Sequence, residues 1–73
     1  MPIRFYFDVE SGRETIRDRD GVEAADLAEA LAEARSVIRE MADAVCADDP
    51  GTAWTLVVRD ATGAVVARLP IRR

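Results

Sequence analysis

The clearest pattern in the chain is a run of apolar positions at helical spacing between residues 27 and 45. Steps of four and three alternate along this run, which places its members on one face of an α-helix. A helix with one apolar face must bury that face against another element. We therefore predict one amphipathic helix whose buried stripe consists of Leu27, Leu31, Ala34, Ile38, Met41 and Val45.

Both ends of this helix are marked by their residues. Asp26 is followed three residues later by Glu29, a capping-box arrangement in which Asp takes the place of Ser or Thr. Residues 48–51 read Asp-Asp-Pro-Gly, a run that breaks helices. The helix is expected to begin after Asp26 and to end near Ala47.

Before the helix, residues 3–9 alternate between apolar and polar side chains. Ile3, Phe5, Phe7 and Val9 would face the core, and Arg4, Tyr6 and Asp8 would face away from it. Ser11-Gly12 supplies a turn, and residues 14–17 form a shorter return strand with Ile16 as its core candidate. Residues 18–21 then read as a polar loop.

After the helix, a second hairpin is predicted. Trp54, Leu56 and Val58 alternate with Thr55, Val57 and Arg59, and Asp60-Ala61-Thr62-Gly63 has the residues of a type I turn. In the last strand, the expected core positions are Val65, Ala67, Leu69 and Ile71, alternating with Val66, Arg68 and Pro70. Pro70 has no N–H to donate, so it marks a sheet edge or the end of the strand.

These elements predict an α+β fold of order ββαββ, with a four-stranded antiparallel sheet and one long helix packed on one face. How the two hairpins join, and whether the first strand meets the third or the fourth, stays open. The 73 residues form a single domain, 1–73. A chain of this size buries only about 60% of its unfolded surface. With one cysteine and no histidine, neither a disulfide nor a zinc site is expected to stabilise it, which leaves oligomerisation.

Charge is distributed unevenly along the chain. Residues 1–26 have four arginines and seven acidic residues, residues 27–49 have two and six, and residues 50–73 have four and one. The last hairpin is therefore basic in a chain of net charge −4. An acidic chain is a poor candidate for tight binding to a phosphate backbone. No signal peptide and no apolar run of membrane-spanning length is visible, so we expect a cytoplasmic protein without a membrane partner.

Candidate chemistry in the sequence is sparse. The acidic loop 18–23 invites a calcium interpretation, but placing Gly21 at the sixth position of a calcium loop puts Ile16 at the first, where an oxygen ligand is required. Cys46 lacks a histidine base, and a helix C-terminus disfavours its thiolate. Paired glutamates such as Glu29 and Glu33 fit a solvated helix face. We therefore predict a non-enzymatic protein with no catalytic, cofactor-binding or metal-binding residue.

The most informative surface is the sheet face turned away from the helix, here called the outer face. If both hairpins share one sheet, apolar and basic side chains gather there. An aromatic ring among arginines resembles a surface that stacks single-stranded bases, although such surfaces usually carry two or three aromatics. The same face would also suit a protein interface. The candidate interaction residues are Arg4, Tyr6, Val57, Arg59, Val66 and Arg68.

Short motifs along nearly the whole chain resemble a family of short bacterial proteins, mainly alphaproteobacterial, that is classed as a domain of unknown function. They are the opening Pro-Ile-Arg-Phe-Tyr-Phe-Asp-Val of residues 2–9, Asp18-x-Asp20-Gly21-Val22-Glu23 before an Asp26-started helix, Trp54, Val58-x-Asp60-x-x-Gly63 and Leu69-Pro70-Ile71. The resemblance implies a stand-alone bacterial domain and supplies no activity. Members often have His at the position of Asp8, so a role for that His does not transfer.

Two functional hypotheses follow. The first is a small interaction module that forms a homodimer, or binds another protein, through the outer face or a strand edge. The alternative is a regulatory, antitoxin-like protein that contacts nucleic acid through Arg4, Tyr6, Arg59 and Arg68.

Overall fold

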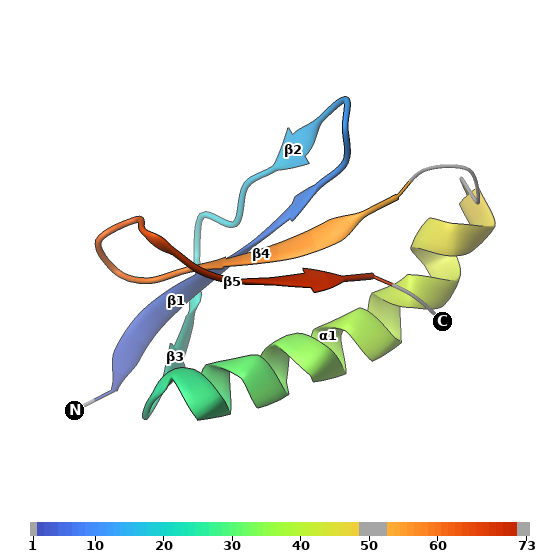
Figure 1. Cartoon of the computed structure of the whole chain (residues 1–73). Coiled ribbons are helices and arrows are strands. Elements are labelled where there is room, and N and C mark those ends of the chain that lie inside the picture. The colour runs from blue at the N-terminus through green and yellow to red at the C-terminus, as the bar shows by residue number, and fades with distance from the viewer. Residues whose placement is uncertain (1, 49–52, 72–73) are drawn as a thin grey trace.

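The computed structural model describes the backbone of residues 2–48 and 53–71, and the side chains of residues 2–42 and 53–71. It contains one helix and an antiparallel sheet, which confirms the α+β class (Figure 1). The elements in chain order are β1 (Ile3–Glu10), β2 (Thr15–Ile16), β3 (Val22–Ala24), α1 (Leu27–Asp48), β4 (Thr55–Arg59) and β5 (Val65–Pro70). The observed end of α1 lies one residue beyond the predicted one. Val45 and Cys46, and the breaker residues 49–51, lie outside the described side chains.

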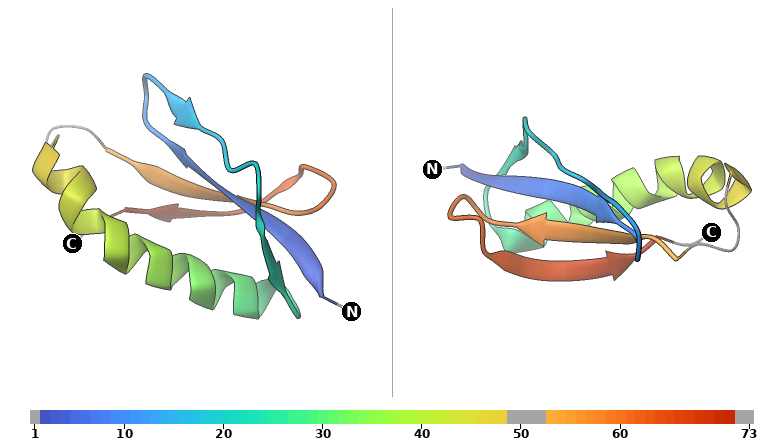
Figure 2. Two further views of the ribbon diagram at one scale, coloured as in Figure 1. Left: turned by 180° about the vertical axis from the view of Figure 1, so that it is seen from behind. Right: turned by 90° about the horizontal axis from the view of Figure 1, so that it is seen from above.

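The strand order β2-β1-β4-β5 answers the question of how the hairpins join. β1 pairs antiparallel with β4 from Tyr6↔Arg59 to Glu10↔Thr55. The first strands of the two hairpins are therefore neighbours in the centre of the sheet. β3 was not predicted; it pairs with Ile3–Phe5 of β1 on the same edge that β2 occupies (Figure 2). The sheet therefore has five strands, and one of its edges consists of two short pieces.

The helix begins as the capping residues predict. Asp26 Oδ1 accepts a hydrogen bond from the Glu29 amide at 2.9 Å, and Glu29 Oε1 accepts one from the Ala25 amide at 3.3 Å. This reciprocal arrangement satisfies amides that the first helical turn leaves open. The local sequence thus fixes where β3 ends and α1 starts.

The buried face of α1 contains the predicted Leu31, Ala34, Ile38 and Met41, and it also includes Ala30, Val37 and Ala42. Ala30, Ala34 and Ala42 are its most buried residues, at 0–2% exposure, and Leu31, Val37, Ile38 and Met41 pack partly around them. Leu27 is 38% exposed, so its assignment to the core is wrong. The alanines face the sheet because their small side chains let the helix backbone approach closely. In the sheet, Leu56 and Val58 are the largest fully buried side chains.

Two further core assignments are wrong. Ile16 is 58% exposed because β2 has only two residues, paired with the end of β1 at the sheet edge. Val65 is 49% exposed because a β-bulge in β5 shifts the register: Ala67 lies opposite Val58, but Val65 lies opposite Arg59. The bulge therefore moves Val65 to an outer-face position.

The turn between β4 and β5 forms where predicted. The Gly63 amide donates to the Asp60 carbonyl at 3.0 Å, and Asp60 Oδ1 accepts from the amides of Thr62 and Ala64. Gly63 adopts φ +90°, a conformation that glycine adopts without steric cost.

Candidate interaction surface

A buried carboxylate organises the centre of the outer face. Asp8 on β1 is 3% exposed, and its two oxygens accept hydrogen bonds from Arg59 Nε at 2.6 Å and Arg59 Nη2 at 3.0 Å. The Asp18 amide donates to Asp8 Oδ1 at 3.0 Å. Asp8 is thus held by a bidentate ion pair to the neighbouring strand and by one backbone donor.

These contacts set the ionisation of the pair. Burial raises the pKa of Asp8, but the hydrogen bonds from Arg59 and the Asp18 amide, with the charges of Arg59 and Arg17, outweigh burial and leave the pKa below its usual value. The hydrogen bond to Asp8 raises the pKa of Arg59. Both groups are therefore charged at neutral pH.

The loop between β2 and β3 closes over the edge of β1. The Asp18 carboxylate accepts from the Phe7 amide at 3.1 Å, the Asp20 amide at 3.2 Å and the Gly21 amide at 3.0 Å. Asp18 thereby takes the place of a strand partner for Phe7 in the gap between β2 and β3. Both Asp18 oxygens already accept backbone donors, which gives this carboxylate a structural role in the loop.

The other basic residues predicted on the outer face also contact carboxylates. Arg4 Nη2 lies 2.7 Å from Glu23 Oε1, and Arg4 also donates to the Asp20 carbonyl. Arg68 on β5 forms an ion pair with Glu10 on β1, so its side chain reaches across β4.

The single predicted aromatic is engaged too, because the Arg59 guanidinium lies 5.2 Å from the centre of the Tyr6 ring. Arg4, Tyr6, Arg59 and Arg68 are thus all held by intramolecular contacts. None of these contacts favours base stacking over a protein interface.

The structure places the two predicted valines differently from each other. Val57 lies at an outer-face register position, opposite Asp8 and Arg68, but is only 4% exposed, so the expectation that it is open to solvent is wrong. The Arg68–Glu10 ion pair crosses the central strand β4, to which Val57 belongs, and the Asp8–Arg59 pair joins β1 to the same strand. Val66 is 37% exposed because it is the extra residue of the bulge.

Exposed apolar side chains are concentrated on β5. Val65 and Val66 are adjacent and both exposed, whereas Ile3, Ile16 and Leu27 are exposed singly on β1, β2 and α1. Sequence reasoning missed Val65, because strict alternation ignores a bulge. The sequence analysis also did not consider Asp8 and Glu10 as partners for Arg59 and Arg68, although alternation places all four side chains on the outer face.

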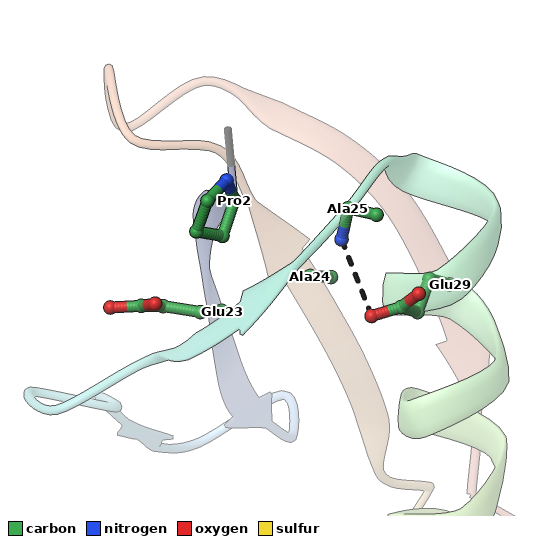
Figure 3. Close-up of a pocket in the computed structure, with 5 residues that line it drawn as sticks. All are labelled: Pro2, Glu23, Ala24, Ala25 and Glu29. Atoms are coloured by element: carbon green, nitrogen blue, oxygen red, sulfur yellow. Dashed lines mark hydrogen bonds between the residues drawn. The ribbon is translucent and has the colours of Figure 1, made fainter.

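A shallow depression lies at the other end of the sheet, between the start of β1, β3 and the first turn of α1 (Figure 3). Its volume is about 520 Å³, and its lining is Pro2, Glu23, Ala24, Ala25 and Glu29. Glu23 pairs with Arg4 and Glu29 caps the Ala25 amide, so both carboxylates already have structural partners. Within the part of the chain that the structure describes, no three metal-ligating side chains gather.

Comparison with known proteins identifies the family. The chain belongs to the family described as a domain of unknown function (DUF6894), whose model matches residues 4–72. This match confirms the resemblance found in the sequence motifs. The comparisons with curated proteins and with solved structures gave no match. No helix within the described ranges is long and apolar enough to cross a membrane.

Proposed function

We propose that this member of the DUF6894 family is a non-enzymatic interaction module that associates with a second copy of itself through the surface of β5. The observation that carries the proposal is the pair of adjacent, exposed β-branched side chains Val65 and Val66. A regular strand would turn one of two neighbours toward the core, but the bulge leaves both at the surface.

The polar chemistry of the outer face supports an interface rather than a reaction site. Three arginines and three acidic residues there neutralise one another as Arg4–Glu23, Arg59–Asp8 and Arg68–Glu10. A face of paired charges beside exposed apolar side chains can be covered without leaving an unpaired ion behind.

The small core gives a reason for association. The large buried side chains among the described residues are Phe5, Phe7, Leu56, Val58 and Ile71, and the most buried positions of the helix hold alanines. Burial of further apolar surface between two copies adds stability that a domain of this size lacks.

Sedimentation velocity from low micromolar to millimolar concentration tests the proposal. We expect the wild type to shift from monomer to dimer, and the double variant Val65→Ser/Val66→Ser to stay monomeric. Ile16→Ser is the matched control, because Ile16 is equally β-branched and 58% exposed but lies on the opposite edge of the sheet. A wild type that is monomeric throughout, or an Ile16→Ser variant that alone loses the dimer, contradicts the proposal.

A further inference from the structure

The hydrogen bonds between β4 and β5 show which residues of β5 point their backbone N–H and C=O groups away from β4. The Ile71 amide donates to the Trp54 carbonyl at 3.0 Å, so these two residues form a hydrogen-bonded pair at the end of the β4–β5 ladder. Hydrogen-bonded and non-bonded pairs alternate in an antiparallel ladder. Leu69 and Ala67 therefore point their backbone groups toward β4, whereas Arg68 and Pro70 point theirs away from it.

Nothing in the described part of the chain pairs with this edge. β5 is the last strand of the order β2-β1-β4-β5, and the view from above in Figure 2 (right) shows no other strand or helix beside its outer side. Pro70 occupies one of the outward positions, where its missing N–H costs the β4–β5 ladder no hydrogen bond. The free edge thus offers the N–H and C=O of Arg68 and the C=O of Pro70.

We infer that β5 pairs antiparallel with β5 of a second copy around a two-fold axis at Arg68; this inference rests on the self-association proposed above. The two Arg68 residues then exchange both backbone hydrogen bonds. Ala67 of each copy lies beside Leu69 of the other in a non-bonded pair, the kind in which side chains approach most closely. Both residues are half-buried in one copy, so the second copy completes their burial on the helix side.

The charge arrangement makes this register acceptable. Like charges directly opposite each other destabilise a strand pair. Each Arg68, however, is already bonded to Glu10 of its own chain across β4. The line along which the two β5 strands meet, here called the seam, therefore contains two neutral ion pairs rather than two free guanidinium groups.

The edges also explain why pairing stops at two copies. The opposite edge of the sheet consists of β2 and β3, of two and three residues, separated by the Asp18 loop. Such an interrupted edge is a poor template for a further strand. A two-fold pairing of β5 therefore closes on itself instead of growing into a fibre.

The seam is small. A stable interface usually involves about 20–30 residues from each partner, and the described part of β5 has only six. The dimer is accordingly expected to dissociate on dilution.

Residue-resolved amide hydrogen exchange of the wild type tests the inference. In the monomer, the Arg68 amide faces solvent and exchanges quickly, while the amides of Ala67 and Leu69 are protected by β4. If exchange of Arg68 proceeds through the monomer, a sample that is nine-tenths dimer slows it about tenfold. If a dimer forms by sedimentation but Arg68 still exchanges quickly, the edge pairing is wrong and the proposed self-association stands. If no dimer forms, the proposed function itself is wrong.

A pair of variants gives an independent readout. Arg68→Pro removes the outward N–H without removing a donor from the β4–β5 ladder, and Arg68→Ala removes the side chain but keeps the N–H. We expect Arg68→Ala to dimerise and Arg68→Pro to be monomeric, with both folded by circular dichroism. If both dimerise, or if neither does, the Arg68 amide does not make the seam and the inference is overturned.

Discussion

A substitution at Gly21 tests how closely the loop between β2 and β3 packs on β1. Its φ is +73°, and a Cβ built there would lie 2.7 Å from the Phe5 carbonyl oxygen and 3.0 Å from Tyr6 Cε1. The Phe5 oxygen belongs to the backbone of a central strand, so it cannot rotate away. Gly21→Ala therefore combines a left-handed conformation with a steric overlap.

The magnitude follows from these two contributions. A left-handed conformation costs a residue with a Cβ about 1–2 kcal/mol, and overpacking against a fixed neighbour adds about 1–3 kcal/mol. We expect Gly21→Ala to lower the free energy of unfolding by about 2–5 kcal/mol. That loss is a large share of the stability of so small a domain.

Gly63 and Gly12 provide matched controls for this substitution. Gly63 has φ +90° but no atom within 4 Å of an added Cβ, so Gly63→Ala should cost only about 1–2 kcal/mol. Gly12 has neither constraint, and Gly12→Ala should be neutral or slightly stabilising. Urea unfolding of the three variants measures the order. If Gly21→Ala costs no more than Gly63→Ala, the loop does not pack on β1 as described.

Three further predictions concern the ion pair and the core. Because the pKa of Asp8 is lower in the folded than in the unfolded chain, its contribution to stability is present above the unfolded pKa and is lost as the pH falls through the folded pKa. Asp8→Asn should therefore be less stable than the wild type at pH 7 and lose less stability between pH 5 and pH 2, and equal acid dependence in urea unfolding would refute this. Ala34→Leu should lower the free energy of unfolding by about 1–3 kcal/mol, whereas Ala32→Leu on the exposed helix face should change it little; equal effects in the same assay would contradict the burial of Ala34 against the sheet. Leu56→Ala should cost about 2–5 kcal/mol in chemical denaturation, and a cost below about 1 kcal/mol would show that Leu56 is not in the core.

Local sequence patterns predicted most of the fold because they reflect backbone geometry. The capping pair Asp26 and Glu29 located the start of α1, and alternation in residues 3–9 located β1. Both patterns depend on residues a few positions apart. They identify the faces of a helix or strand without knowledge of its neighbours.

The wrong predictions concern positions whose burial or pairing is determined by tertiary contacts. Leu27 fits the helical stripe but is 38% exposed in the first turn of α1, whereas Ala30 in the same turn is fully buried. β3 exists because β1 offers Ile3–Phe5 as a partner, which three residues of sequence cannot reveal. The bulge at Val66 changes the face of Val65 without any local signal.

The sequence predicted which arginines lie on the outer face, but not that they form ion pairs within the chain. The sequence placed Arg59 and Arg68 on the outer face, where the register confirms them. Their pairing with Asp8 and Glu10 depends on which strands are neighbours, which the sequence left open. Val57 is buried between these strands, and the exposed valines of this face lie on β5.

The central claim is that two copies meet at β5. Isotope-filtered NMR on an equimolar mixture of labelled and unlabelled chain, at a concentration where sedimentation detects dimer, tests it directly. The account predicts intermolecular contacts from the methyl groups of Val65, Val66 and Leu69. Contacts from Ile16 or Leu27 in their place, or a chain that stays monomeric, would contradict it.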